Sequence, residues 1–180
     1  MFIEKEAGVT TSSVRIVGPR DGKAGSLGGF GVRFMIDGAE SGGGVALVEH
    51  PMDPRALAGP MHRHSREDEY SYVLEGRVGA DLGGEIVYGK PGDLIFKPRG
   101  QWHTFWNAGD EPARILEIIS PAGFEKFFDQ ITDLAATGRL DPPTMVSLAA
   151  EYGAEVDFES LPGLVAKHNL VFMDGPPPER

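Results

Sequence analysis

The chain has 180 residues, 41% of them hydrophobic and 24% charged, which is enough for one domain with a buried core. It has no cysteine, and this excludes disulfides, thiolate zinc sites and a cysteine nucleophile. The formal net charge of −10 disfavours nucleic acid and anionic membrane surfaces as partners. No apolar segment approaches the length of a membrane span, and the charged start of the chain does not resemble a secretory signal, so we expect a cytoplasmic protein.

Turn-forming residues dominate the chain up to Pro121. The 25 glycines and 14 prolines exceed average usage without a repeating period, which favours many short strands over a helical bundle. After about 25 residues that form a lead-in strand or an arm with loops, short apolar runs alternate with turn signals at the spacing of an all-β sandwich or barrel. The pair Gly83-Gly84 marks a two-residue hairpin between two of these runs. The expected strands cover residues 32–36, 45–48, 70–74, 78–82, 85–88, 94–96, 103–106 and 114–119.

The period of the apolar residues changes after Pro121 to that of a helix. One helix begins near Phe124, Pro142-Pro143 opens a second, and a weaker third covers about residues 159–168. We interpret the aromatic stripe of the first helix mainly as a docking face, with a lid over an aromatic pocket as the alternative. The stripe contains Phe124, Phe127, Phe128, Ile131, Leu134 and Ala135.

These patterns divide the chain into three parts. Residues 1–121 are expected to form the β domain with an N-terminal arm. Residues 122–170 are expected to form a C-terminal helical cap, and residues 171–180 a flexible proline-rich tail.

Three of the five histidines have the spacing of metal ligands. His62 and His64 form an H-x-H pair, whose side chains lie on the same face of a strand. Glu69 follows shortly afterwards, and His103 comes later in the chain. Three imidazoles and a carboxylate suit one divalent ion of Fe, Mn, Ni, Co, Cu or Zn, and do not suit calcium. The two other histidines, His50 and His168, are not expected to be ligands.

Two motifs surround these residues. The chain reads H-x-H-x4-E-x6-G from His62 to Gly76, and G-x5-P-x-G-x2-H-x3-N from Gly92 to Asn107. Together they resemble the two signature motifs of the cupin superfamily, separated by the 15 residues of 77–91.

The resemblance covers about residues 45–120 and departs from the family at one point. The glycine that leads the first motif would fall at Ala56, whereas Gly59 lies nearer to the histidines. The resemblance implies an all-β double-stranded β-helix, also called a jelly-roll barrel, with an ion inside its mouth. It also implies that His62, His64, Glu69 and His103 are the four ligands. Asn107 is expected to cap a turn and not to touch the ion.

A looser resemblance concerns the reaction. The single barrel, the complete ligand set and the helix after the barrel are similar to quercetin dioxygenase-type cupins with one domain. This resemblance implies a metal-dependent dioxygenase that acts on a small aromatic or enolic, flavonol-like substrate, with O₂ as a co-substrate. Four protein ligands leave one or two positions on the ion open for such molecules. Glu69 then has a second expected role as the catalytic general base.

Two other classes of function stay open. One is a non-redox metal enzyme, such as an isomerase, cyclase or lyase, and the other is a barrel that binds a small molecule without turnover. A sugar-phosphate isomerase is disfavoured because no cluster of lysines and arginines accompanies the motifs.

A homodimer is expected from the strand that carries Glu69. If Glu69 points inward, Tyr70, Tyr72 and Leu74 form a row on the opposite face of that strand. Such a row needs cover from another sheet, from the helices or from a second copy of the chain.

Overall fold

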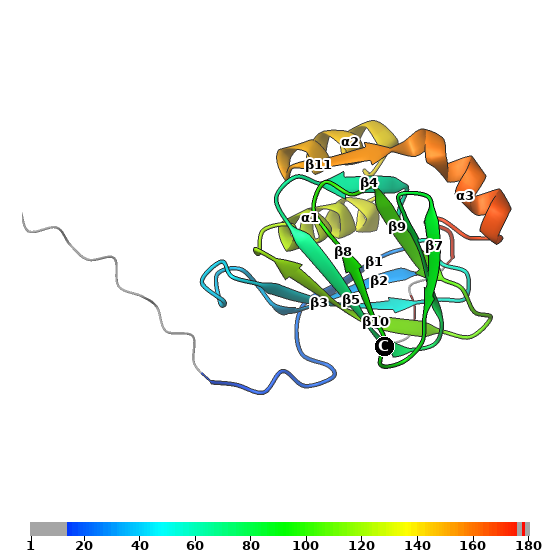
Figure 1. The fold of residues 1–180 in the computed structure, drawn as a ribbon. Helices are drawn as coiled ribbons and strands as arrows, with labels where there is room; N and C mark the ends of the chain where they lie inside the picture. The colour runs from blue at the N-terminus through cyan, green and yellow to red at the C-terminus, as the bar shows by residue number, and fades with distance from the viewer. Residues whose placement is uncertain (1–13, 176–177, 179–180) are drawn as a thin grey trace, which may run out of the picture.

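A computed structural model describes residues 14–175 and residue 178 (Figure 1). Residues 1–13 of the expected arm, and residues 176–177 and 179–180 of the expected proline-rich tail, lie outside the described residues. The strands are β1 Ala24–Leu27, β2 Phe30–Ile36, β3 Ala46–Met52, β4 Met61–His64, β5 Asp68–Glu75, β6 Val78–Leu82, β7 Glu85–Gly89, β8 Leu94–Lys97, β9 His103–Asn107, β10 Ala113–Ser120 and β11 Ala154–Asp157. The helices are α1 Glu125–Ala136, α2 Pro142–Glu151, the 3₁₀ helix η1 Phe158–Ser160 and α3 Leu161–His168.

The strands form two antiparallel sheets. The six-stranded sheet has the order β1-β2-β3-β10-β5-β8, and the five-stranded sheet has the order β11-β4-β9-β6-β7. Strands that neighbour each other in space are often far apart in sequence, as in the pairs β3–β10 and β6–β9. This arrangement is the double-stranded β-helix of a jelly roll, so the expected fold class is confirmed.

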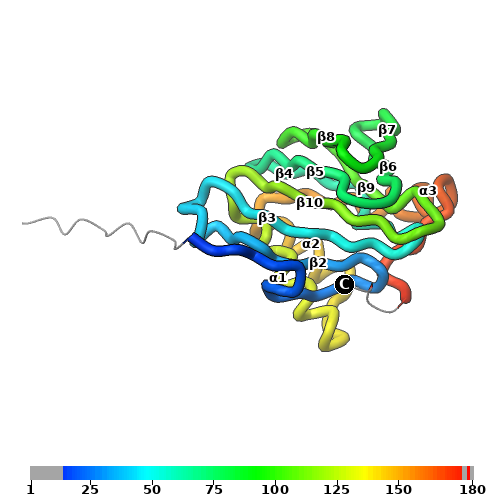
Figure 2. Tube along the Cα trace, turned by 90° about the horizontal axis from the view of Figure 1, so that it is seen from below, coloured from blue at the N-terminus to red at the C-terminus, as the bar shows by residue number. Residues whose placement is uncertain are grey.

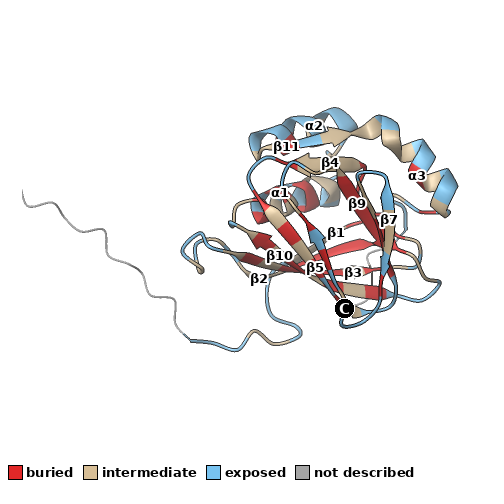
Figure 3. Cartoon of the chain, viewed as in Figure 1, coloured by how far each residue is buried: buried red, intermediate tan, exposed pale blue. Residues whose placement is uncertain are grey.

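Buried residues, red in Figure 3, lie in the strands of both sheets, and alternation along a strand turns their side chains toward the space between the sheets. Strand β10 shows this most clearly, because every second residue from Ala113 to Ile119 is buried and the residues between them are partly exposed. The expected hairpin between β6 and β7 is present, with positive φ angles of 67° and 98° at Gly83 and Gly84. Glycine adopts these angles without steric cost, so the pair fixes the register of the hairpin.

The C-terminal segment contributes a strand that the sequence patterns did not reveal. Strand β11 pairs with β4, the strand of the H-x-H pair, with Ala154 opposite His64 and Val156 opposite His62. The segment is therefore more than a helical cap, since it completes the wall of the barrel beside two candidate ligands. Strand β1, Ala24–Leu27, begins at the end of the segment expected to form a lead-in strand or an arm.

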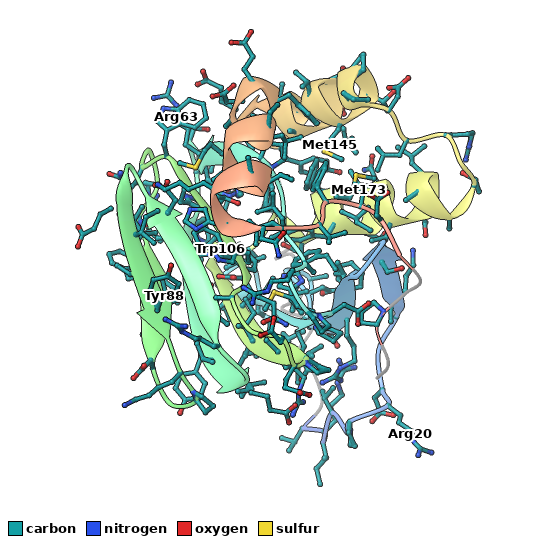
Figure 4. The ribbon with its side chains drawn as sticks, turned by 90° about the vertical axis from the view of Figure 1, so that its right-hand side faces the viewer. Arg20, Arg63, Tyr88, Trp106, Met145 and Met173 are labelled. Carbon is teal, nitrogen blue, oxygen red and sulfur yellow. The ribbon has the colours of Figure 1, made fainter. Side chains whose placement is uncertain are left out.

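The helices cover the sheets at one end of the barrel. Helix α1 lies against β1 and β2 (Figure 2). Helix α3 lies beside Trp106, which is almost fully buried (Figure 4), and Leu164 of this helix belongs to the same buried apolar cluster as Trp106. No helix in the described part of the chain is long and apolar enough to cross a membrane.

Candidate metal centre

The structure brings the four sequence-predicted ligands together between the two sheets. Strand β4 supplies His62 and His64, and β9 supplies His103, which is the register partner of His62. Strand β5 of the opposite sheet supplies Glu69. One ligand atom from each of the four residues lies within 4.8 Å of the other three. All four side chains therefore converge on a volume that one ion would fill.

Backbone carbonyls orient two of the imidazoles. Nδ1 of His62 donates to the carbonyl of Pro60 at 2.8 Å, and Nδ1 of His103 donates to the carbonyl of Gln101 at 2.9 Å. Because a carbonyl can only accept, each ring carries its proton on Nδ1 and presents the lone pair of Nε2. Such a bond at the second nitrogen is typical of histidines that bind metals.

His64 differs from the other two histidines. Neither of its ring nitrogens has a hydrogen-bond partner among the described residues, although both are buried. Its Nε2 lies 3.6 Å from Oε1 of Glu69, and its Nδ1 lies 3.9 Å from Oε2 of Glu67. Nε2 of His103 is likewise buried without a hydrogen-bond partner, 3.3 Å from Oε2 of Glu69. Buried polar atoms without partners are costly, and an ion bound by these atoms would satisfy them.

The electrostatics keep the ligands in the forms that bind a metal. Burial lowers the pKa of His64 to about 4 and that of His62 well below its ordinary value, so both imidazoles are neutral at pH 7. Burial alone would raise the pKa of Glu69, but the Lys97 ammonium 3.0 Å away holds it well below its ordinary value. His62 and His64 are thus neutral imidazoles beside an ionised carboxylate, which fits a divalent transition metal.

Lys97 joins the candidate ligands to a second buried carboxylate. Its Nζ lies 3.0 Å from Glu69 Oε2 and 2.9 Å from Glu117 Oε2. Glu117 Oε2 also accepts a hydrogen bond of 2.7 Å from the hydroxyl of Ser71. All of these side chains are at most 3% exposed. An ammonium between two carboxylates compensates the charges that burial removes from water.

The sequence reasoning missed Lys97 and Glu117, although a signal was present. Glu117 alternates with Ile115 and Ile119, so it takes an inward position in an apolar strand. Lys97 shares the inward face of β8 with Ile95, which is also buried. A charge at an inward position predicts a buried partner of opposite charge, but the pattern does not say which residue that partner is.

An aromatic cavity adjoins the cluster and is lined by two of the four candidate ligands, His62 and Glu69. Its free volume is about 50 Å³, enough for a few water molecules. The polar residues that line it are His62, Glu69 and Glu117. Its other lining residues include Phe30, Phe105, Phe124, Phe127, Phe128, Ile131, Met145, Ala149, Val156 and Phe172. The stripe of α1 therefore does more than dock the helix, because its three phenylalanines form a wall of the cavity.

The three residues that the sequence did not assign as ligands, His50, His168 and Asn107, lie outside the candidate metal cluster. His50 donates from Nδ1 to the carbonyl of Gly31 and stacks on Phe30. His168 packs against the ring of Trp106. The amide of Asn107 bonds four backbone groups around its turn, as expected for a capping residue.

Fold and site together define a small β-barrel with a candidate His₃Glu metal site. Residues 49–119 match the model of the cupin domain, so this part of the chain is a cupin domain. Among solved structures, KdgF from Halomonas sp. has a TM-score of 0.56 and 19% identity, covering 63% of this chain and 99% of that one. This likeness concerns the fold alone.

Three known proteins are similar in sequence. The tetracenomycin polyketide synthase protein TcmJ of Streptomyces glaucescens is 38% identical over 60 residues, 33% of this chain and 40% of that protein. Germin-like protein 1 of Brassica napus is 30% identical over 139 residues, 69% of this chain and 65% of that protein. Oxidoreductase iacF of Pestalotiopsis fici is 33% identical over 90 residues, 48% of this chain and 43% of that protein. The chain thus spans less than two thirds of each relative's length.

The cluster predicts that two histidines on one strand are needed to bind a metal. In the double variant His62→Ala, His64→Ala we expect the affinity for zinc to fall more than about 100-fold, because even the loss of an outer partner of a ligand costs about 10- to 100-fold. Elemental analysis after dialysis, together with a titration of the metal-free protein, measures this. His168→Ala, which lies outside the cluster, is the control. One zinc per chain retained by the double variant would contradict the assignment.

Proposed function

We propose that this protein is a metal-dependent enzyme that binds a small aromatic or enolic substrate and acts on it as a dioxygenase. One observation carries the proposal. The candidate ligands His62 and Glu69 line the same cavity as the phenylalanines of α1 and the barrel. A substrate ring in that cavity would thus place an oxygen beside the cluster.

The four ligands divide the work at the site. An ion held there supplies a Lewis acid for a substrate oxygen and, if it is a reducible metal, access to O₂. His62, His64 and His103 would hold the ion through their ring nitrogens. Glu69 adds a negative charge and is our candidate for the group that takes the substrate's hydroxyl proton. Lys97 makes Glu69 a weak base, so the transfer depends on a hydroxyl made more acidic by the ion.

The size of the cavity limits the substrate. A dry cavity of about 150 Å³ accepts a benzene ring, whereas this one has about 50 Å³. A single ring therefore requires the phenylalanine wall of α1 to shift, and a flavonol with three rings requires a far larger opening. We accordingly favour a substrate with one ring, or an enol of similar size, within the quercetin dioxygenase-type chemistry.

A non-redox reaction on the same class of substrate is the second candidate. The likeness to TcmJ, which is a polyketide synthase protein, favours a cyclase or isomerase that needs no O₂. The likeness to iacF, an oxidoreductase, supports the dioxygenase. Both reactions would begin with the loss of a hydroxyl proton at the ion. A barrel that binds without turnover is the outcome if neither reaction occurs.

The test is O₂ uptake by protein loaded with iron, manganese, nickel, cobalt, copper or zinc, against a panel of phenols and enols. Uptake with a reducible metal and none with zinc supports the dioxygenase. Product formation without O₂ uptake, at the same rate with zinc as with a reducible metal, would rule out the dioxygenase and support the non-redox enzyme. Tight binding without product in any metal form would contradict both enzymes.

Glu69→Gln separates a ligand from a catalytic base. The three histidines should still hold an ion, so metal content should fall only in part. If Glu69 also takes the proton, turnover per bound metal should fall by about 10²- to 10⁴-fold. Turnover that simply follows metal content would show that Glu69 is only a ligand. Glu49→Gln, a buried glutamate paired with Arg33 outside the cavity, is the matched control.

We further propose a cytoplasmic homodimer, joined through the outer face of the six-stranded sheet. In the described structure β8 is an edge strand of this sheet, and its residues Leu94 and Phe96 are 54% and 48% exposed. Tyr70 stacks on Phe96 with ring centroids 4.9 Å apart, and Tyr72 is the register partner of Leu94. An apolar row along a sheet edge suits a second copy of the same row.

Light scattering at micromolar concentration should give twice the mass of the chain. Phe96→Glu should shift the mass to that of a monomer, because a carboxylate would be buried in the interface. Tyr88→Glu places the same charge on an exposed position of the other sheet and should leave the dimer intact. A monomer mass for the unchanged protein would remove the proposal.

A further inference from the structure

One residue that lines the cavity, Glu117, has a buried carboxylate oxygen without a hydrogen-bond partner among the described residues, and the ligand cluster does not account for it. Glu117 lines the cavity from β10 and is 1% exposed. Its Oε2 is occupied by Lys97 and Ser71. Its Oε1 is buried and accepts no hydrogen bond from any residue that the structure describes. Since a bare buried carboxylate oxygen is costly, this atom calls for a donor from a bound molecule.

The position of Glu117 relative to the candidate metal centre is fixed by one shared ammonium. Lys97 Nζ lies about 3 Å from Glu69 Oε2 and about 3 Å from Glu117 Oε2. The two oxygens are therefore at most about 6 Å apart. A single small molecule that the cavity admits can thus reach both the candidate metal centre and Glu117.

We propose that Glu117 is a second substrate-binding carboxylate, whose Oε1 accepts a hydrogen bond from an O–H or N–H group of the substrate. The inference rests on the proposed function and narrows its substrate class. One oxygen of the substrate lies at the metal centre beside Glu69, and a second group, which must carry a hydrogen, lies at Glu117. The substrate is then a ring or enol with two oxygens, or an oxygen and a nitrogen, a few bonds apart.

The two carboxylates have different roles in this proposal because their negative charges are compensated to different extents. Glu69 faces the Lys97 ammonium and the candidate ion, so its negative charge is compensated from two sides. Glu117 shares only the same ammonium and one hydroxyl. Burial raises the pKa of Glu117 to about 7, and Lys97 opposes that rise. At pH 8 Glu117 is therefore a charged acceptor, and a donor from the substrate would bind to it strongly.

The experiment compares two probes on the zinc-loaded protein at pH 8. Catechol has a second O–H, whereas 2-methoxyphenol has a methyl ether in its place. Calorimetry in two buffers of different ionisation enthalpy gives the affinity and the number of protons released. We expect catechol to bind roughly 10- to 100-fold more tightly, as for one hydrogen bond to a charged group. Both probes should release the same number of protons, because Glu117 retains the second proton of catechol.

Glu117→Gln tests the residue itself. Lys97 and Ser71 would keep the amide oxygen, so the NH₂ group would face the cavity and replace an acceptor with a donor. We expect the preference for catechol to disappear or reverse, while Glu49→Gln retains it. Thermal unfolding of each variant verifies folding, and the comparison of proton release in the unchanged protein does not depend on any variant.

The outcomes distinguish the inference from the proposed function. Binding of both probes with no preference, or one extra proton released with catechol, would overturn the role of Glu117 and leave the proposed function standing. Binding of neither probe to the zinc-loaded, unchanged protein would overturn the proposed function, and the role of Glu117 with it. An unchanged preference in Glu117→Gln would likewise assign the second O–H to another residue.

Discussion

The buried ammonium of Lys97 is the interaction on which the interior of this barrel depends. Two carboxylates, Glu69 and Glu117, lie between the sheets with almost no contact with water, and ionised carboxylates cannot remain there unpaired. Lys97 contacts both at about 3 Å and lies over the ring of Phe105. Removing it would leave two buried carboxyl groups without a counter-charge, so at least one of them would have to take up a proton. The ammonium thus keeps Glu69 ionised in the interior, in the form that binds a cation.

The barrel wall around the cluster is completed from distant parts of the chain. Strand β4 carries the H-x-H pair and lies between β9, which supplies His103, and β11, which comes from the C-terminal segment. Helix α1 and its N-cap residue Phe124 then cover the cavity with phenylalanines. The ring centroid of Phe124 lies 4.1 Å from that of His64. Burial lowers the pKa of His64 and keeps it neutral at pH 7. The C-terminal segment therefore contributes to the ligand chemistry, because it excludes water from it.

The clustering of the four candidate ligands could be predicted from the sequence because its information is local. Alternation places His62 and His64 on one face, and the fixed spacings around Glu69 and His103 identify both motifs. Strand β11 could not be predicted in this way, since Ala154–Asp157 is short and its partner β4 lies about 90 residues earlier in the chain. The inward position of Lys97 in β8 could not be predicted for another reason. The strand's apolar residues Leu94 and Phe96 point outward, and its lysine points inward.

The orientation of β8 determines which residues lie inside the barrel and which lie on its outer surface. Because Lys97 must reach Glu69 and Glu117, the pleat forces its neighbour Phe96 onto the outer face. An outward residue beside a buried charge need not be apolar, yet Phe96 stacks on Tyr70, and Leu94 lies opposite Tyr72. An apolar row at these positions adds nothing to the monomer's core, which lies on the other face. Its placement is explained if a second copy covers it, and burial of this row would in turn hold β8, and so Lys97, in register with the candidate ligands.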